Sequence, residues 1–364
     1  MRVLQVINSL SVGGAENLLC ESLPFYVDCN IDIATLTSRN NVLYNKAQNS
    51  TKGKIFELGN GSVYNPFVIV KLLKLIRNYD IIHIHLFPSL YFVVVANLLL
   101  FRRRKLIYTE HSTNNRRRSG FLLRIVDKFI YRHIDAIISI AQDVDKELKA
   151  HLGANSLSKV ILIENGINLD KFIKAEAYPK SQFFNDPNSK ILIQVSSFRF
   201  PKDQKTLIQA LTHLPDIYKL ILVGTGPLLE DNIAFVKTLA LENRVLFLGL
   251  RDDIPRLLKT SDVIVLSSKY EGLSLSSIEG MVVGKPFIAS DVKGLREIVK
   301  GNGLIFPFGD AKELAYQIGI SVNDLEKREQ IISTCYQKAI QYDIKNMVKR
   351  YIDIYSLLSH SRSF

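Results

Sequence analysis

The chain has 364 residues, which is too long for one ordinary hydrophobic core, so we expect about two domains. Hydrophobic residues make up 47% of it and charged residues 23%, a globular composition that argues against a disordered or fibrous protein. The three cysteines form no metal-binding or redox spacing and no signal peptide is evident, so we expect a reducing cytoplasm.

The formal net charge of +12 is distributed unevenly along the chain. The excess is concentrated in two runs of the first half, Arg102-Arg103-Arg104-Lys105 and Arg116-Arg117-Arg118. Such runs favour phosphate-rich partners, namely nucleic acid, anionic lipid or a pyrophosphate, although a solvated basic face is the simpler alternative. The apolar run at 90–101 is too short to span a bilayer, which takes about 20 residues, so it predicts a buried helix followed by arginines at a membrane surface.

Strands and helices alternate from the start of the chain. Short apolar strands are expected at 3–7, 31–36, 54–58, 81–85, 105–109, 136–140 and 160–163, with helices at 15–23 and 68–76 between them. Residues 171–190 are polar, contain two prolines and predict a linker. A second series follows, with strands at 191–195, 219–223, 244–247, 263–266 and 286–289 and a last helix near 347–358.

This alternation predicts the α/β class. We expect two doubly wound, Rossmann-like domains of similar size, each built on a parallel sheet with helices on both faces. Ligands of such sheets bind at the carboxyl ends of the strands. The two domains are therefore expected to face a central cleft that holds the active site.

Two loops of the first half follow predicted strands. Gly13 and Gly14 precede a helix and would let backbone amides approach an anion, although a tight structural turn explains them as well. The third glycine of a dinucleotide fingerprint is missing. His111 ends a strand, where it can bond a substrate hydroxyl or carbonyl, although a lone histidine is more often structural. His83 and His85 share one strand face, but no third ligand completes a zinc site, so we expect no metal.

The second half offers cations and glycines in corresponding loops. Arg199 and Lys205 stand around a loop-to-helix junction, where they offer a forked charge and a point charge to one pyrophosphate. Two solvated cations are the alternative. Gly224 lies in a glycine-rich strand exit, Leu222-Val223-Gly224-Thr225-Gly226-Pro227, where the backbone either passes close to a ligand or makes an ordinary turn.

Two carboxylates eight positions apart, Glu271 and Glu279, flank the start of a helix that follows a buried strand. The amides at 273–277 form an anion site at that helix start. Glu279 can accept hydrogen bonds from a ribose diol, and Glu271 can touch a sugar at the mouth of the cleft. A glycosidase acid and base pair is the alternative, but a phosphate site between the two, with cations nearby, favours a nucleotide sugar.

Seven short motifs occur in an order that resembles the retaining, nucleotide-sugar-dependent glycosyltransferases of family 4 (glycosyl transferases group 1), which have the GT-B fold. They are GGAE, TEHS, ENGINLDKF, SFRFPKDQKTLIQAL, LVGTGP, NRVLFLG and E-x7-E. The resemblance covers nearly the whole chain. It implies an acceptor-binding domain at 1–170, onto which a helix at 345–364 packs back, and a linker with a nucleotide-sugar-binding domain at 171–344.

The resemblance also implies roles for individual residues. Catalytic roles fall to Glu271 and His111 beside the transferred sugar, and to Arg199 and Lys205 on the donor diphosphate. Glu279 would bind the ribose. The remaining donor-binding positions are Gly14, Gly224, Arg244, Val245, Leu250, Leu273, Ser274, Leu275 and Ser276. The family commonly has E-G-F-G-L-P at the first glutamate, whereas this chain has Ser274 and Ser276 for the second glycine and the proline, so no particular donor sugar carries over.

The implied reaction is a metal-independent and cofactor-free transfer of a sugar with retention at the anomeric carbon. The donor would be a UDP-hexose or UDP-N-acetylhexosamine, and the acceptor a saccharide or a polyprenyl-diphosphate-linked saccharide. We expect a cytoplasmic hexosyltransferase of surface polysaccharide biosynthesis (capsule, lipopolysaccharide or exopolysaccharide). It would be peripheral on the inner face of the plasma membrane, with the arginines at 102–104 and 116–118 against anionic lipid.

Two alternatives stay open at this point. One is a nucleotide-sugar epimerase or hydrolase of the same architecture, which would convert the donor without an acceptor. The other is a basic nucleic-acid-binding protein, which is disfavoured because the basic runs lack interleaved aromatic residues and any recognised binding motif.

Overall fold

The computed structural model describes residues 1–27, 29–101, 103–111, 120–153, 158–271 and 274–360. The chain forms two compact units. Unit 1 comprises Met1–Gly166 together with the segment from Ile344 onward, and unit 2 comprises Ile167–Asp343. Unit 1 is therefore assembled from both ends of the sequence.

Unit 1 is built on a parallel seven-stranded sheet in the order β3-β2-β1-β4-β5-β6-β7. The strands are β1 (Arg2–Ile7), β2 (Asn30–Thr35), β3 (Ile55–Glu57), β4 (Ile81–His85), β5 (Lys105–Glu110), β6 (Ala136–Ser139) and β7 (Val160–Leu162). In register, Val3 of β1 pairs with Ile31 of β2 and with Ile81 of β4. Strand β1 is buried continuously from Val3 to Ile7, as expected when helices cover both faces of a sheet.

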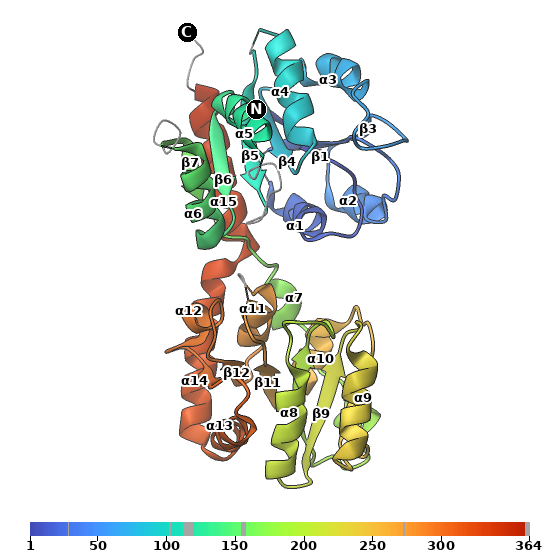
Figure 1. The fold of residues 1–364 in the computed structure, drawn as a ribbon, viewed down its shortest axis with the longest axis vertical. Helices are drawn as coiled ribbons and strands as arrows, with labels where there is room; N and C mark the ends of the chain where they lie inside the picture. The colour runs from blue at the N-terminus through green and yellow to red at the C-terminus, as the bar shows by residue number, and fades with distance from the viewer. Residues whose placement is uncertain (28, 102, 112–119, 154–157, 272–273, 361–364) are drawn as a thin grey trace. The chain divides into compact units, whose positions relative to one another are not determined.

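Helices cover the two faces of this sheet (Figure 1). They are α1 (Gly14–Ser22), α2 (Tyr44–Ser50), α3 (Val68–Ile76), α4 (Ser89–Leu99), α5 (Phe121–Arg132), α6 (Gln142–Leu152), α15 (Ile344–His360) and the short 3-10 helix η1 (Leu23–Phe25). One apolar core includes Leu72 of α3 and Tyr131 of α5. The other includes Leu19 of α1 and Tyr355 of α15, so the last helix of the chain completes unit 1.

Unit 2 contains a parallel six-stranded sheet in the order β10-β9-β8-β11-β12-β13. Its strands are β8 (Lys190–Val195), β9 (Tyr218–Val223), β10 (Val245–Phe247), β11 (Val263–Leu266), β12 (Phe287–Ser290) and β13 (Leu304–Phe306). Its helices are α7 (Asp170–Ile173), α8 (Gln204–Ala210), α9 (Leu229–Thr238), α10 (Ile254–Thr260), α11 (Leu275–Val282), α12 (Arg296–Val299), α13 (Ala311–Asn323) and α14 (Leu325–Ala339), with 3-10 helices η4 (Lys180–Gln182), η5 (Leu211–His213) and η6 (Ile340–Tyr342).

The predicted architecture of two doubly wound α/β domains is confirmed by the two sheets. Strand β13 was not predicted, because its three residues follow a glycine-rich turn and only Phe306 is fully buried. The segment expected as a linker at 171–190 contains most of α7 and all of η4. Phe172, Tyr178 and Phe183 of this segment pack on the core of unit 2, so it is a folded part of that unit.

The apolar run at 90–101 forms α4 and the turn after it, and Val93 and Val94 are fully buried there. Among the helices that the structure describes, none is both long and apolar enough to pass through a bilayer.

Candidate functional site

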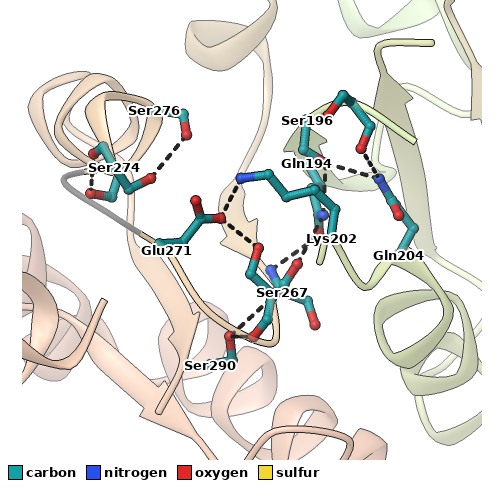
Figure 2. Close-up of polar contacts among 12 residues, drawn as sticks. Gln194, Ser196, Lys202, Gln204, Ser267, Glu271, Ser274, Ser276 and Ser290 are labelled. Carbon is teal, nitrogen blue, oxygen red and sulfur yellow. Dashed lines mark hydrogen bonds and ion pairs between the residues drawn. The ribbon is translucent and has the colours of Figure 1, made fainter. Parts of the chain in front are cut away.

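In each unit, polar side chains gather where the strands of the parallel sheet end, here called the carboxyl edge. The two groups are described separately. The group in unit 2 lies on the loops after β8 and β11 and consists of charged residues and hydroxyls (Figure 2).

The loop after β8 is held by side chains of the neighbouring segments. The Gln194 amide donates to Ser196 Oγ at 2.9 Å and to the Ser267 carbonyl at 3.3 Å. Gln204, the first residue of α8, donates to Ser196 Oγ at 3.0 Å and to the Ser197 carbonyl at 3.1 Å. Asp203 is the N-cap of α8, since its Oδ1 accepts a hydrogen bond from the Thr206 amide at 3.2 Å. The loop is therefore fixed at both of its ends.

Lys202 and Glu271 form an ion pair at this edge, and Figure 2 shows the two side chains pointing toward each other. Both are largely buried, with side-chain exposures of 16% and 12%. Ser268 Oγ also donates to Glu271 Oε1, at 2.6 Å. The backbone reinforces the contact, because Lys202 and Ser268 pair as an antiparallel bridge between the two loops. The carboxylate thus holds the largely buried ammonium in place between the two loops.

The two cations that the sequence analysis assigned to one diphosphate are both exposed. Arg199 is exposed on the loop after β8. Lys205 is exposed on α8, and its Nζ lies 5.5 Å from the centre of the Phe235 ring of α9. Lys202, which the sequence analysis missed, is the lysine whose ammonium contacts Glu271. The N-cap residue Asp203 is the signal that could have found it, because a helix starting at residue 204 leaves Lys202 in the loop.

Ser274 directly precedes α11, and Ser276 and Glu279 lie within it. Ser274 is the N-cap residue, and its Oγ lies 3.1 Å from Ser276 Oγ. Ser276 and Glu279 line a small cavity together with Val195 and Leu266, the last residues of β8 and β11. Leu275 begins the helix and is half-buried, whereas Leu273 lies outside the described residues.

Gly224 follows β9 in a backbone conformation with φ of +136°. A Cβ at this position would lie 2.1 Å from the Ser196 carbonyl oxygen. Glycine is therefore required at this position because two loops of the protein approach each other closely. Of the two explanations that the sequence left open, this is the structural one and needs no ligand.

Arg244 does not join this group. It precedes β10, at the edge of the sheet where the strands begin, and its guanidinium donates to the carbonyl oxygens of Leu214, Pro215 and Tyr218 at 3.0–3.1 Å. Val245 opens β10 at the same opposite edge. Leu250, in contrast, follows β10 and is exposed on the carboxyl-edge side.

In unit 1, the helix start after β1 is occupied by a side chain of the protein. A Cβ at Gly13 would lie 2.2 Å from Glu16 Oε2, so the Glu16 carboxylate folds back over the start of α1. Burial raises the pKa of Glu16. Gly14 is exposed with open space beside it. An incoming phosphate at this helix start would therefore meet a carboxylate as well as free amides.

At the carboxyl edge of unit 1 lies a hydrogen-bonded chain that includes the buried His83 and His85 and the half-buried His111. His111 Nε2 lies 3.1 Å from His85 Nδ1, and His85 Nε2 lies 2.5 Å from Gln5 Oε1. The Gln5 amide nitrogen in turn donates to the Tyr355 hydroxyl of α15 at 3.2 Å. His83 contacts the Tyr355 hydroxyl at 2.6 Å and Thr109 Oγ1 at 2.7 Å.

This chain defines the tautomer of His111. Because the Gln5 amide nitrogen donates to tyrosine hydroxyls, its carbonyl faces His85 and accepts the Nε2 proton of that ring. His85 Nδ1 then has a lone pair and accepts a hydrogen bond from His111 Nε2. His111 Nδ1 is left with a lone pair, which suits a hydroxyl donor.

The three rings are neutral at physiological pH. Burial lowers the pKa of His83 to about 3 and that of His111 to about 4. Burial and the neighbouring rings lower the pKa of His85 well below its ordinary value. All four nitrogens of His83 and His85 face protein partners, and no group of three metal-binding side chains occurs in the part of the chain that the structure describes.

Only part of the predicted basic surface falls on described residues. Arg102 and the run at 116–118 lie outside them. Arg103 is exposed, whereas the Arg104 guanidinium donates to the Arg77 carbonyl oxygen at 2.6 Å and so binds the end of α3.

Two family models match the chain, one for each unit. The model described as Glycosyltransferase Family 4 matches residues 12–171, and the model described as Glycosyl transferases group 1 matches residues 178–338. Between them they leave out only a short segment at the boundary and the two ends of the chain.

Named relatives and solved structures agree with these matches. The chain is 27% identical over 287 residues to N-acetyl-alpha-D-glucosaminyl L-malate synthase of Bacillus anthracis, covering 77% of this chain and 75% of that enzyme. It is 27% identical over 243 residues to N,N'-diacetylbacillosaminyl-diphospho-undecaprenol alpha-1,3-N-acetylgalactosaminyltransferase of Campylobacter jejuni, covering 65% and 64%. The fold of Anabaena Alr3699/HepE, solved in complex with UDP, matches with a TM-score of 0.79 at 23% identity, over 98% of this chain and 100% of that one.

Proposed function

The chain belongs to the family 4 glycosyltransferases, and on that basis we propose that this hexosyltransferase moves a sugar from a nucleoside diphosphate to a hydroxyl of a saccharide or lipid-linked saccharide. The observation that carries the proposal is the ion pair of Lys202 with Glu271 at the carboxyl edge of unit 2. A carboxylate holds the ammonium in place until a phosphate arrives, so the site is charged and ordered beforehand.

The donor diphosphate would be bound by Arg199 and by a lysine of the loop after β8. The sequence singles out Lys205 for this role, but the geometry favours Lys202, because its ammonium already lies between the two loops that end β8 and β11. Glu279 would bind the ribose from within α11. Amides at the start of α11 would add partial positive charge to the same site.

The reaction breaks the bond between the anomeric carbon and the diphosphate oxygen and forms one from that carbon to the acceptor oxygen. Negative charge develops on the departing diphosphate, where Arg199 and Lys202 would stabilise it. With the acceptor on the same face as the leaving group, a phosphate oxygen takes the acceptor proton and the configuration is retained. Glu271 and His111 position the sugar, and this scheme needs no metal ion.

We further propose a UDP-hexose or UDP-N-acetylhexosamine as donor, supported by the UDP bound to the Anabaena protein. The acceptor would be a saccharide on a polyprenyl diphosphate, supported by the name of the Campylobacter relative. Such a reaction places the enzyme in the assembly of a surface polysaccharide at the cytoplasmic face of the plasma membrane.

The donor is tested by thermal shift with a panel of UDP and GDP sugars. The true donor should raise the melting temperature in proportion to the logarithm of its concentration over its dissociation constant. Absence of stabilisation by every nucleotide sugar at millimolar concentration would reject the donor site. Incubation of the donor without acceptor is the control, since a transferase then leaves nearly all of the donor intact.

A further inference from the structure

The outward side of α5 is apolar although it faces solvent. Leu123, Ile125, Val126 and Phe129 are 52, 52, 46 and 50% exposed, whereas a soluble helix normally turns such residues inward. The buried side of the same helix is formed by Asp127, Ile130 and Tyr131.

The charged residues on this side of α5 are all basic. Arg124, Lys128 and Arg132 follow one another at a spacing of four and are exposed, so they form a stripe beside the apolar residues. The one carboxylate of the helix, Asp127, is turned inward. It accepts a hydrogen bond from the Tyr91 hydroxyl of α4 at 2.8 Å and contacts His151 Nε2 of α6 at 2.9 Å. We call these exposed residues, Leu123–Val126, Lys128, Phe129 and Arg132, the α5 face.

Leu123 lies in the first turn of α5, the helix that follows β5. Leu123 lies on the same side of the helix as Asp127 and Ile130, which are fully or nearly fully buried, yet it is half exposed. Exposed aromatic rings also occur in unit 1: Phe87 lies 5.1 Å from Tyr91 between ring centres, and Tyr64 lies 6.1 Å from Phe87.

We propose that the α5 face docks onto an anionic lipid bilayer. A helix that presents apolar side chains next to a stripe of lysine and arginine fits the boundary between head groups and acyl chains. A basic stripe matches anionic lipid in charge, and aromatic rings are enriched at the same depth. This proposal deepens the proposed function, because a lipid-linked acceptor would reach an enzyme attached in this way from the bilayer itself.

The absence of tryptophan from the sequence provides a direct probe. Phe129→Trp places a single fluorophore on the α5 face, and its emission should shift to shorter wavelength with vesicles of phosphatidylcholine and phosphatidylglycerol. Tyr316→Trp, at a position of unit 2 that is 63% exposed, is the matched control and should show no shift. Both are measured in the full chain without donor or acceptor, so loss of transferase activity does not affect the result.

Two variants separate the apolar and the electrostatic contributions in vesicle flotation. Arg124→Ala/Lys128→Ala/Arg132→Ala should weaken binding to the anionic vesicles roughly 100-fold, since each basic residue near such a surface contributes about fivefold. Ile125→Ser/Phe129→Ser should weaken it at least tenfold. Tyr316→Ser/Leu325→Ser removes two large side chains of unit 2 that are more exposed than Ile125 and Phe129, and it should leave binding unchanged.

Several outcomes would overturn the proposal. Equal binding to neutral and anionic vesicles, or unchanged binding of both α5 variants, would exclude docking through this face. If the emission of the Phe129→Trp variant shifts to shorter wavelength without lipid, and does so in proportion to protein concentration, the face would instead be assigned to a second copy of the chain.

Discussion

The carboxyl edges of the two units differ in the charge of the polar side chains that they hold. In unit 1, the chain from Gln5 through His85 to His111 consists of neutral donors and acceptors, of which Gln5 and His85 are buried and His111 is half-buried. In unit 2, Lys202 and Glu271 are charged and partly open to solvent. Desolvation penalises charge, which keeps the histidine rings of unit 1 neutral, whereas in unit 2 the Lys202 ammonium and the Glu271 carboxylate compensate each other's charge.

The difference indicates that the two edges suit different ligand groups. A charged edge can exchange the Glu271 carboxylate for a phosphate, which is what a site for a nucleoside diphosphate requires. In unit 1, a neutral His111 with a defined tautomer can orient a neutral hydroxyl. The four predictions below test this contrast, starting with the largest expected effect.

Lys202→Ala should lower turnover by about 10² to 10³-fold, since the variant lacks the preorganised ammonium that we propose stabilises the departing diphosphate. Lys205→Ala, three residues further along the same chain segment, should lower it less than tenfold because its ammonium lies over Phe235. Turnover numbers of the two variants, with thermal melting to verify folding, distinguish the lysines. If Lys205→Ala lost more turnover than Lys202→Ala, binding of the diphosphate would be assigned to Lys205, as the sequence analysis expected.

Arg244→Ala should destabilise unit 2 by about 2–4 kcal/mol, since the carbonyl oxygens of Leu214, Pro215 and Tyr218 lose a charged donor. Donor affinity of the folded fraction should be unchanged, because the residue lies at the opposite edge of the sheet from Glu271. Urea unfolding and donor titration measure the two quantities. Weaker donor binding at normal stability would place Arg244 in the donor site after all.

Acid should destabilise unit 1 through its buried histidine rings. The folded-state pKa of His83 and of His85 is depressed, so below about pH 6.5 the unfolded chain binds protons that the folded chain does not. The pKa of His111 is lowered as well, to about 4, so stability is lost as the pH falls, by about 4 kcal/mol between pH 7 and 5.5 for the three rings. His85→Gln should remove about a third of this dependence in urea titrations at the two pH values. An unchanged slope would show that these rings are not neutral in the folded state.

Gln5→Leu should lower turnover by about tenfold through the orientation of His111 alone. Without the Gln5 carbonyl, His85 loses the partner that keeps its proton on Nε2, and the preference of His111 for the Nε2–H tautomer is lost. Nitrogen-15 shifts of the His111 ring report the tautomer. Tyr26→Phe removes another partner of Gln5 but leaves the bond to His85, so it should keep the wild-type shifts. Wild-type His111 shifts in Gln5→Leu would contradict the relay.

Much of the fold could be predicted from the sequence, because continuous apolar runs between helical segments are typical of parallel sheets. The strands at 3–7, 81–85 and 263–266 agree with β1, β4 and β11 to within a residue at each end. Strand β13 and the folding of residues 171–190 onto unit 2 were not predictable in this way, because both depend on contacts with distant residues.

The candidate site was predictable only in part. The position of Glu271 at a strand end followed from the pattern, but which lysine meets it depends on where α8 begins, and Asp203 decides that. The histidine pair on β4 was visible as a spacing of two. Its partners were not, since Gln5 lies on a neighbouring strand and Tyr355 lies 350 positions away from Gln5.

The return of the chain from unit 2 into α15 has a consequence for synthesis. Tyr355 and Met347 complete the core beneath α1, so the unit that leaves the ribosome first is the last to be finished. Until the final helix emerges, one apolar side of its sheet is covered only in part, by α1, η1 and α2, while all of unit 2 is being made. A chain that stops before Ile344 would therefore carry a complete second unit and an open, aggregation-prone first one.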